Sequence, residues 1–504
     1  MKAFPSGGCF GDLILDAIAR HGGRLAVVDG DRRLTYRELG ARIARALAIL
    51  ETLGLGPGDT VAQLSANSSD LWAVMAAAYI GGYRSVTLHP FGGRDDQAFI
   101  LADCGAKLLI ANAAHAGRAA SLVCDGLAVL GHEAGGALAG FWDVPAAETA
   151  LPRVASGAAE DIVRIAYTGG TTGRAKGVLL SNRAMTANAT MALAAIPFPS
   201  APRFLCPAPV SHGAGSIVVP TLSLGGTVIL QRGFDPALFC AAAAAFDANL
   251  TWLVPTMITA LLDSPAAGFP ASFETVIWSG APMTPDRVRQ AIDRFGPVLV
   301  QCYGQSEAPN TIMLLTGEEQ ARHPAAVGRP FPGIAVALLD DDGEPVAAGQ
   351  PGEICVRGPL VMSGYLNMAE ATATAFAGGW LHTGDVGVVD PDGLYRIVDR
   401  KKDMIITGGF NVYPREIEDV IAAQKGVAAV AVIGVPDAHW GEAVTAIVVP
   451  RAGGAPDPEM LIAAVRAAKG PIHVPKAFDF VDALPLTPLG KPDKRALRAR
   501  YAAD

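Results

Sequence analysis

The sequence predicts an α/β protein with two bodies. The first is a large N-terminal domain of helix-covered, mostly parallel sheets plus a small β unit, and the second is a mobile, small α+β C-terminal domain. Three observations support this prediction. The chain has 504 residues, enough for several domains. Hydrophobic residues make up 51% and charged residues 17%, so the chain can bury large cores. Short apolar runs alternate with Ala-rich stretches, which is typical of parallel sheets covered by helices.

The expected strands of the large domain are short and apolar, as buried parallel strands are. They span residues 108–111, 162–166, 227–230, 250–254, 275–277 and 298–301. Helices are expected over residues 236–246 and 284–295, and the second begins with Thr284-Pro285, a capping residue followed by proline. Residues 334–398 hold short strands between Gly- and Asp-rich turns, which indicates a small antiparallel or barrel-like unit.

A charged strip at residues 399–403 ends this pattern. We place the domain boundary there, with residues 1–400 in the large domain and residues 401–504 in the small one. The expected elements of the small domain are helices over residues 416–423 and 458–469 and strands over residues 427–433 and 444–449. About a hundred residues with this mixed pattern are enough for a separate domain.

Composition excludes several classes of protein. The net charge is −8, from 40 Lys and Arg against 48 Asp and Glu, which argues against nucleic acid as a partner. The apolar runs are too short to span a bilayer, so we expect no integral membrane contact. Seven scattered cysteines without a CxxC pair favour free thiols in a reducing cytoplasm. The sequence leaves the oligomeric state open, a homodimer included.

A Gly- and Thr-rich loop at residues 167–177 follows an expected strand and is the strongest local signal. Its amides, hydroxyls and terminal lysine predict a phosphate-binding loop. The residues concerned are Thr168, Gly169, Gly170, Thr171, Thr172 and Lys176. The loop is not a Walker A motif, because Ala175 and Gly177 flank the lysine where that motif has Gly and Ser or Thr.

This loop resembles the phosphate-binding signature of adenylate-forming enzymes: acyl-CoA synthetases, adenylation domains of peptide synthetases, and beetle luciferases. The resemblance continues along nearly the whole chain, and its motifs follow in the family's order. These motifs are residues 34–39 (LTYREL), 209–215 (PVSHGAG), 279–283 (SGAPM), 303–307 (YGQSE), 380–385 (WLHTGD), 399–418 and 485–491 (PLTPLGK). Several matches in one order make chance an implausible explanation.

The resemblance implies a nucleotide site. Glu307 would be the Mg²⁺ ligand, Tyr303 would stack on adenine, and Asp385 would accept the ribose hydroxyls. Lys491 would stabilise charge that develops at the α-phosphate. Besides the loop residues, the residues assigned to ATP or AMP are Gly280, Ala281, Pro282, Tyr303, Gly304, Ser306, Asp385, Arg400 and Lys491. We assign catalysis to Lys491, His212 and Glu307.

The resemblance also implies an acyl pocket, a coenzyme A site and a hinge. The acyl-binding residues are His212, Gly213, Val254, Gln301 and Cys302; the coenzyme A residues are Gly408, Gly409 and Phe410; and the hinge is Lys402. The small residues 213–216 after the histidine predict a roomy, apolar pocket. We read the remaining His and Cys residues as structural.

The implied function is ATP-dependent ligation of a carboxylic acid to coenzyme A through acyl-AMP, with release of AMP and pyrophosphate and with ATP, Mg²⁺ and coenzyme A as cofactors. The acid is expected to be hydrophobic: fatty, aryl or polycyclic. Two alternatives remain: a stand-alone enzyme that loads a carrier protein, or a member that performs only the thioester-forming step. Three departures from the family pattern bear on them, since Gly169 replaces Ser, Ala175 replaces Pro and Ser306 replaces Thr.

Overall fold

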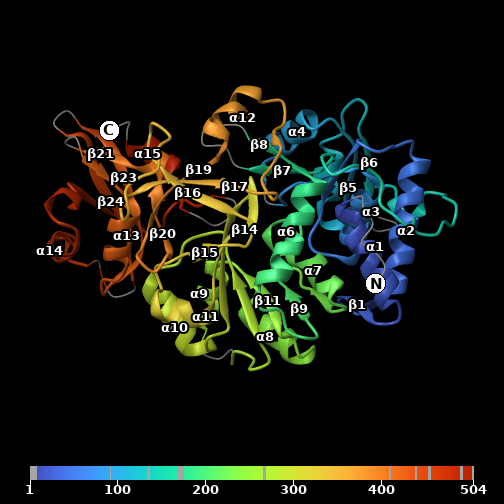
Figure 1. Ribbon diagram of the computed structural model, residues 1–504, viewed down its shortest axis with the longest axis horizontal. Coiled ribbons are helices and arrows are strands. Elements are labelled where there is room, and N and C mark those ends of the chain that lie inside the picture. The colour runs from blue at the N-terminus through green and yellow to red at the C-terminus, as the bar shows by residue number, and fades with distance from the viewer. Residues whose placement is uncertain are drawn as a thin grey trace.

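A computed structural model describes most of the chain. The described residues are 8–90, 92–132, 137–168, 175–264, 268–407, 410–437, 440–451, 454, 456–487 and 492–501. Figure 1 shows the elements after residue 405 gathered at one end of the molecule and the two large sheets with their helices at the other. The predicted fold class is confirmed.

The described residues form a nine-stranded sheet in the order β15-β14-β13-β12-β11-β9-β10-β1-β2. The strands from β1 to β13 within this order run parallel, and the outer pairs are antiparallel. Their bounds are β1 (Leu25–Asp29), β2 (Arg32–Thr35), β9 (Arg203–Cys206), β10 (Thr227–Leu230), β11 (Leu250–Leu253), β12 (Thr275–Trp278), β13 (Leu299–Gln305), β14 (Ala308–Leu315) and β15 (Arg329–Pro330).

A seven-stranded sheet has the order β18-β8-β7-β4-β3-β5-β6 among the described residues. Its strands from β7 to β6 are parallel, and β8 returns antiparallel to β7. The bounds are β3 (Thr60–Leu64), β4 (Arg84–Thr87), β5 (Ala106–Ala111), β6 (Ala128–Gly131), β7 (Ile162–Thr168), β8 (Lys176–Ser181) and β18 (Gly364–Tyr365). One apolar core lies between the two large sheets.

Two smaller sheets complete the strands that the structure describes. The first is the antiparallel unit predicted for residues 334–398, and it lies between the C-terminal elements and the large sheets (Figure 1). Its strands are β16 (Ala335–Leu339), β17 (Gly352–Arg357), β19 (Leu381–Val389) and β20 (Tyr395–Arg400). The second has its own apolar core and comprises β21 (Ile405–Thr407), β22 (Phe410–Val412), β23 (Val427–Asp437), β24 (Gly441–Pro450) and β25 (Ala477–Phe480).

The helices cover these sheets (Figure 1). In the large part they are α1 (Phe10–His21), α2 (Tyr36–Thr52), α3 (Ser69–Gly81), α4 (Arg94–Asp103), α5 (Ala116–Ala120), α6 (Asn182–Ala195), α7 (Val218–Ser223), α8 (Pro236–Ala245), α9 (Pro255–Asp263), α10 (Pro285–Phe295), α11 (Gly317–Arg322) and α12 (Ala369–Ala375). In the C-terminal part they are α13 (Pro414–Ala422), α14 (Pro458–Lys469) and α15 (Lys494–Tyr501).

The first family-like motif, residues 34–39, has a structural task. Thr35 caps α2, with its hydroxyl accepting from the Glu38 amide (3.2 Å), while Glu38 accepts from the Thr35 amide (2.8 Å). Tyr36 is fully buried, and its hydroxyl lies 3.0 Å from the carbonyl of Leu222 and 2.6 Å from that of Gly226. The motif thus fixes where α2 begins and ties it to the end of α7 and the loop before β10.

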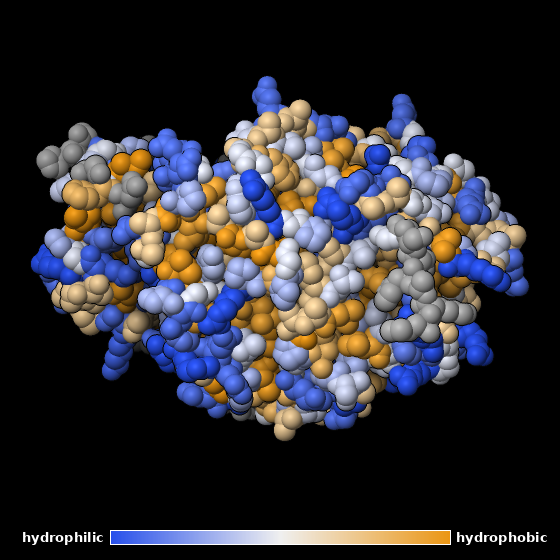
Figure 2. All heavy atoms as spheres, viewed as in Figure 1, coloured by the Kyte–Doolittle hydropathy of each residue, from blue (hydrophilic) through white to orange (hydrophobic). Residues whose placement is uncertain are grey.

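Two further predictions are tested by the described residues. All seven cysteines are free. No helix of the described chain has both the length and the apolar character needed to cross a bilayer, and Figure 2 shows hydrophilic and hydrophobic residues interspersed on the face it presents. The division of the chain at residue 400 stays a prediction.

His132 gives the fold a pH-dependent element. It is 3% exposed, and neither ring nitrogen has a hydrogen-bond partner among the described residues. Burial lowers its pKa to about 4, with Asp70 opposing and Arg42 reinforcing the shift. The folded protein therefore holds a neutral imidazole below pH 6.5, where the unfolded chain takes up a proton.

We therefore predict that the free energy of unfolding falls as the pH drops from 6.5 toward 4. At pH 5 this histidine should account for about 2 kcal/mol of the loss, since one pKa unit corresponds to about 1.4 kcal/mol. Chemical denaturation of wild type and His132→Leu at pH 8 and pH 5 measures it. Equal losses in both proteins would contradict the prediction.

Candidate active site

The ends of three parallel strands bring the predicted nucleotide residues together. The strands β11, β12 and β13 lie side by side, with Leu253 opposite Trp278 and Trp278 opposite Gln301. Gly280 lies two residues after the end of β12 with φ of +92°, a conformation that disfavours other residues. A Cβ on Gly280 would lie 3.9 Å from a methyl group of Val254. The segment with Gly280, Ala281 and Pro282 therefore lies at the carboxyl ends of these strands, where open α/β sheets bind ligands.

Asp385 is a buried carboxylate of this region that two side chains hold in place. It is 5% exposed, and it lies on β19 directly after Gly384, whose φ is +72°. Tyr303 Oη donates to Asp385 Oδ2 (2.7 Å), and Arg400 Nε donates to Oδ1 (3.0 Å). Burial and the adjacent Asp385 raise the pKa of Tyr303 well above its usual value, so the phenol stays a donor. Three predicted residues from β13, β19 and β20 thus form one cluster.

Glu307 and the end of the phosphate loop are joined through Tyr365. Tyr365 Oη donates to Glu307 Oε1 (2.9 Å), and Lys176 Nζ lies 5.0 Å from the centre of the Tyr365 ring. Burial, followed by the effect of Glu307, raises the pKa of Tyr365 and keeps its hydroxyl protonated. Within the described chain no hydrogen bond reaches Glu307 Oε2. A carboxylate oxygen left open beside a phosphate loop fits a Mg²⁺ ligand.

The phosphate loop itself is described only at its two ends. Thr168 ends β7 and Lys176 begins β8, and the two residues pair across these antiparallel strands. Both therefore lie at one sheet edge. The other predicted residues of the loop and of the coenzyme A and lysine motifs lie outside the described residues: Gly169, Gly170, Thr171, Thr172, Gly408, Gly409 and Lys491.

His212 packs against a second histidine, which the sequence did not single out. The rings of His212 and His89 are 5.3 Å apart and nearly perpendicular, and His212 Nδ1 is 2.9 Å from the hydroxyl of Ser211. Arg164 donates to the carbonyl of Ser211 (2.8 Å). Burial, then His89 and Arg164, lower the pKa of His212 to about 3. The imidazole is therefore neutral at physiological pH and acts through hydrogen bonds rather than charge.

Two of the small residues after His212 are required by close packing around their backbone, and the roomy pocket stays a prediction. A Cβ on Gly215 would lie 1.8 Å from the carbonyl oxygen of Val210, so glycine is needed for the chain to fold back. A Cβ on Gly213 would lie 3.1 Å from the indole of Trp252. Asn310, at φ of +54°, donates to the Gly213 carbonyl (3.1 Å). These residues are small because neighbouring groups pack closely against their backbone.

The predicted acyl residues Gln301 and Cys302 lie on opposite faces of β13. Gln320 of α11 donates to Gln301 Oε1 (3.1 Å) and accepts from Trp278 Nε1 (3.4 Å). Trp278 belongs to the core on one face of the sheet, whereas Cys302 packs with Trp252 in the core on the other. The structure therefore brings Cys302, and not the side chain of Gln301, to the face of Trp252.

The predicted hinge residue and the described coenzyme A residue lie in the segment that follows β20. Lys402 is in the short 3₁₀ turn Lys401–Asp403. Phe410 begins β22 and is 55% exposed, and Ile406 on the paired strand is 54% exposed.

Two further predicted nucleotide residues lie near the end of β13. Gly304 is half-buried, and a Cβ there would lie 2.3 Å from the Asn310 amide. Ser306 is half-buried in the turn between β13 and β14.

A second group of potential metal ligands lies on the antiparallel sheet. Within the described residues, ligand atoms of Glu353, Cys355 and His382 lie within 4.8 Å of one another. Glu353 already accepts from the Gly384 amide (3.0 Å) and from Lys401 Nζ (3.1 Å). Burial, then Glu353, raise the pKa of Cys355 to about 12, so its sulfur remains a thiol rather than a metal-binding thiolate. This group is a hydrogen-bonded cluster.

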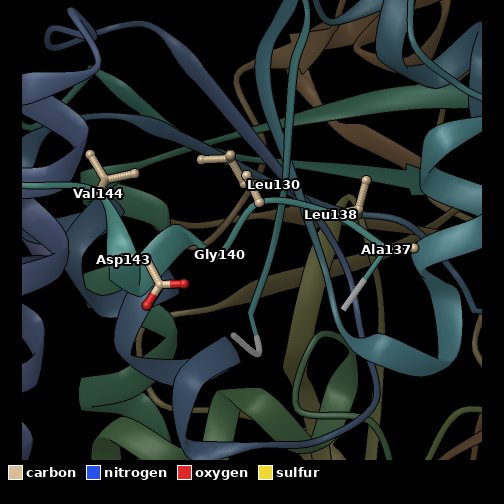
Figure 3. Close-up of a pocket in the computed structure, with 7 residues that line it drawn as sticks. Leu130, Ala137, Leu138, Gly140, Asp143 and Val144 are labelled. Atoms are coloured by element: carbon tan, nitrogen blue, oxygen red, sulfur yellow. The ribbon is translucent and has the colours of Figure 1, made fainter. Parts of the chain in front are cut away.

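A cavity of about 580 Å³ lies elsewhere. Figure 3 shows its lining residues around the end of β6 and the short turn that follows. The strands β4, β3 and β5 separate β6 from β7 and the phosphate loop. No residue that the sequence assigns to the site lines this cavity.

Four residues that the sequence did not single out thus organise the site: Tyr365, Asn310, Trp252 and Glu353. Tyr365 and Glu353 stand beside glycines in the turn-rich region, Gly364-Tyr365 and Gly352-Glu353. These neighbouring glycines were the feature of the sequence that could have pointed to the two residues. Asn310 carries no local signal, because its partners are almost a hundred residues away.

Comparison with known proteins supplies the context for this geometry. Residues 15–366 match the family model described as AMP-binding enzyme, and residues 416–491 match that described as AMP-binding enzyme C-terminal domain. The medium/long-chain-fatty-acid–CoA ligase FadD8 of Mycobacterium tuberculosis is 40% identical, over 97% of this chain and 90% of the relative. A feruloyl-CoA synthase of an Amycolatopsis species is 38% identical, over 94% of this chain and 96% of the relative.

Solved structures share this fold along nearly the whole chain. The amide bond synthetase McbA from Marinactinospora thermotolerans has a TM-score of 0.91 at 36% identity, over 98% of this chain and 99% of that one. ATP-bound MatB from Rhodopseudomonas palustris has a TM-score of 0.90 at 30% identity, with the same coverage.

We predict that Tyr365→Phe weakens the binding of ATP with Mg²⁺ about tenfold, because it removes the hydroxyl that orients Glu307. Binding of ATP without Mg²⁺ should change much less, since Lys176 keeps the aromatic ring. Isothermal titration calorimetry with and without the ion measures both. Tyr83→Phe, at a buried tyrosine whose hydroxyl is 3.4 Å from the Leu55 carbonyl, is the matched control. An equal loss with and without Mg²⁺ would refute the assignment.

Proposed function

Because the chain belongs to the family of AMP-binding enzymes, we propose that it is an ATP-dependent carboxylic acid–CoA ligase. Membership confirms the resemblance to adenylate-forming enzymes. The observation that carries the proposal is the pairing of Asp385 with Tyr303 and Arg400 at the strand ends. It supports a nucleotide site there, because each carboxylate oxygen keeps a second lone pair for a ribose hydroxyl.

In the proposed first step, a carboxylate oxygen of the acid attacks the α-phosphorus of ATP. The new oxygen–phosphorus bond forms as the bond to the bridging oxygen breaks, and pyrophosphate leaves with that electron pair. Lys176 and Lys491 would place positive charge where negative charge develops. His212 would orient the acid by hydrogen bonding, since its neutral ring carries no charge.

One residue of the proposed site is suited to bind Mg²⁺. Glu307 would hold Mg²⁺ through its open oxygen, together with phosphate oxygens and water. The ion would neutralise phosphate charge during the transfer. Tyr365 fixes the other oxygen of Glu307 and so sets the direction of the open one.

In the second step, the thiol of coenzyme A attacks the acyl carbon of acyl-AMP. A carbon–sulfur bond forms, the carbon–oxygen bond to AMP breaks, and the thiol proton is released to solvent. The thiol must reach the acyl carbon of acyl-AMP after pyrophosphate has left the α-phosphorus, so we propose that the small domain rotates about Lys402 between the two steps. The rotation would withdraw Lys491 and present Gly408, Gly409 and Phe410.

The acid is proposed to be hydrophobic. Relatives that match along almost the whole chain are named for fatty acids, for ferulate and for a bicyclic propanoate. Free thiols at all seven cysteines support a reducing compartment, for which we propose the cytoplasm.

The decisive experiment follows pyrophosphate and CoA thioester together, with ATP, Mg²⁺, coenzyme A and a panel of fatty, aryl and polycyclic acids. Both products from one class of acid are expected. Lys491→Ala should lose most pyrophosphate release yet still convert supplied acyl-AMP, because the lysine is assigned to the first step alone. Normal ATP-dependent turnover in that variant would refute the assignment.

Other outcomes identify the alternatives. Pyrophosphate without thioester would replace coenzyme A by a carrier protein or by an amine, and the likeness to an amide bond synthetase makes the amine worth including. Thioester from supplied acyl-AMP alone would leave only the second step. Neither product with any acid would refute the ligase.

The size of the acid follows from what lies beside Gly213. Trp252 is 3% exposed and its indole packs on Gly213, next to His212. The Ser216 hydroxyl and the Gly213 carbonyl are both held by Asn310, at 2.7 Å and 3.1 Å. We propose that this wall limits the length of the acid and favours compact aryl or polycyclic acids over extended chains.

We predict that Trp252→Leu raises kcat/KM for long fatty acids relative to a cinnamate-type acid by about tenfold, the scale on which one or two methylenes are discriminated. Thioester formation across a chain-length series measures it. Trp278→Leu is the matched control, because this tryptophan lies on the neighbouring strand but faces the opposite core. An unchanged chain-length profile in Trp252→Leu, or the same change in both variants, would contradict the prediction.

A further inference from the structure

The two residues beside Lys402 are held by different parts of the protein. Lys401 Nζ lies 2.8 Å from Asp341 Oδ1 and 3.1 Å from Glu353 Oε2. Asp341 follows β16 and Glu353 lies on β17, so both partners belong to the antiparallel sheet on the large-domain side. Lys401 is thus bound to the body that precedes the hinge, although it begins the predicted small domain.

Asp403 is bound to the other body. Arg498 Nη2 lies 3.0 Å from Asp403 Oδ1, and Arg498 is on α15, which packs on β23 of the C-terminal sheet. The Asp403 side chain is 15% exposed, which shields the pair from water. Lys402, between the two anchored residues, has no recorded side-chain partner among the described residues.

The two ion pairs of Lys401 differ in how much they contribute to holding the lysine. The Asp341 side chain is 89% exposed, and exposed pairs contribute little. The Glu353 side chain is 7% exposed and has donors on both oxygens: the Gly384 amide on Oε1, and His382 Nδ1 (3.0 Å) with Lys401 on Oε2. Removing one partner from such a buried group is costly, so Glu353 is the main anchor.

Other contacts join the two bodies directly. The Arg415 amide, at the start of α13, donates to Asp399 Oδ2 (2.7 Å) at the end of β20. Arg396 on β20 lies 3.9 Å from Glu416. A rotation about Lys402 must break these contacts, whereas the pairs of Lys401 and Asp403 each stay within one body and persist.

We propose that the pairs Lys401–Glu353 and Asp403–Arg498 anchor the two ends of the hinge and confine the rotation of the small domain to Lys402. Glu353 and Arg498 are then positioning residues. The inference rests on the proposed two-step reaction, which needs two domain orientations. Glu353 also holds Gly384, the neighbour of Asp385, so the fixed end of the hinge and the ribose-facing turn share one carboxylate.

The test uses Glu353→Gln and Arg498→Met, which lie in different bodies and meet only through the hinge. The glutamine keeps an oxygen for the Gly384 amide but loses the charge that holds Lys401. Arg495→Met is the matched control, because Arg495 is on α15 too, without a recorded partner in the described chain. Brief trypsin digestion measures how accessible the hinge is to the protease, since Arg400, Lys401 and Lys402 are cleavage sites.

Both variants should be cleaved at residues 400–402 about fivefold faster than wild type, while cleavage elsewhere and the control stay unchanged. In both, kcat of each half-reaction should fall about tenfold, and in Arg498→Met the KM for ATP and acid should stay unchanged, since those ligands are held by the large domain. The double variant should lose less than the sum of the two, because freeing one end already releases the hinge.

Unchanged cleavage at the hinge in both variants would overturn the proposal, as would full additivity in the double variant. If Glu353→Gln does not fold, Arg498→Met alone decides, through cleavage at a site far from the substitution. Because digestion needs no substrate, a failed hinge proposal is distinguishable from a failed ligase, which would give no thioester with any acid while hinge cleavage still responded.

Discussion

The buried carboxylate of Asp385 is the constraint on which the rest of the site depends. A carboxylate that is 5% exposed needs donors, and it takes them from Tyr303 on the nine-stranded sheet and Arg400 at the end of the antiparallel sheet. The interaction therefore fixes two sheets relative to each other at the place where their strands end. It also fixes the residue just before the proposed hinge, since Arg400 directly precedes Lys401.

The elements that the sequence predicted well are those determined locally. The expected strands at residues 227–230, 250–254 and 275–277 match β10, β11 and β12, and the Thr-Pro start at Thr284 does cap α10. Apolar runs and caps carry such information because their physical causes lie within a few residues. The assignments of Tyr303 and Asp385 came instead from the resemblance of their motifs, residues 303–307 and 380–385, to those of a known family.

Contacts between distant residues were not predictable in this way. The closeness of Tyr365 to Glu307 follows from how two sheets meet, and that of Asn310 on β14 to Gly213 follows from where the 3₁₀ turn Gly213–Ile217 lies in the fold. The small residues 213–216 show the difficulty most clearly. From sequence alone, a glycine suggests empty space beside the backbone. Here the space of the missing Cβ is filled by the Val210 carbonyl at Gly215 and by the Trp252 indole at Gly213. Size alone does not distinguish a pocket from close packing.

The contacts around Lys402 fall into two kinds, and their strengths must be matched for the proposed reaction. Contacts between the bodies, such as Asp399 with the Arg415 amide, stabilise one orientation and have to be weak enough to break in each cycle. Contacts within each body, such as Glu353 with Lys401, have to survive that motion. The two ion pairs of Lys401 differ in strength because their partners differ in burial. The pair with the enclosed Glu353 can persist during the rotation, whereas the pair with the exposed Asp341 contributes little. In the proposed motion, the position of the buried charges would confine the pivot to one residue, without a flexible linker.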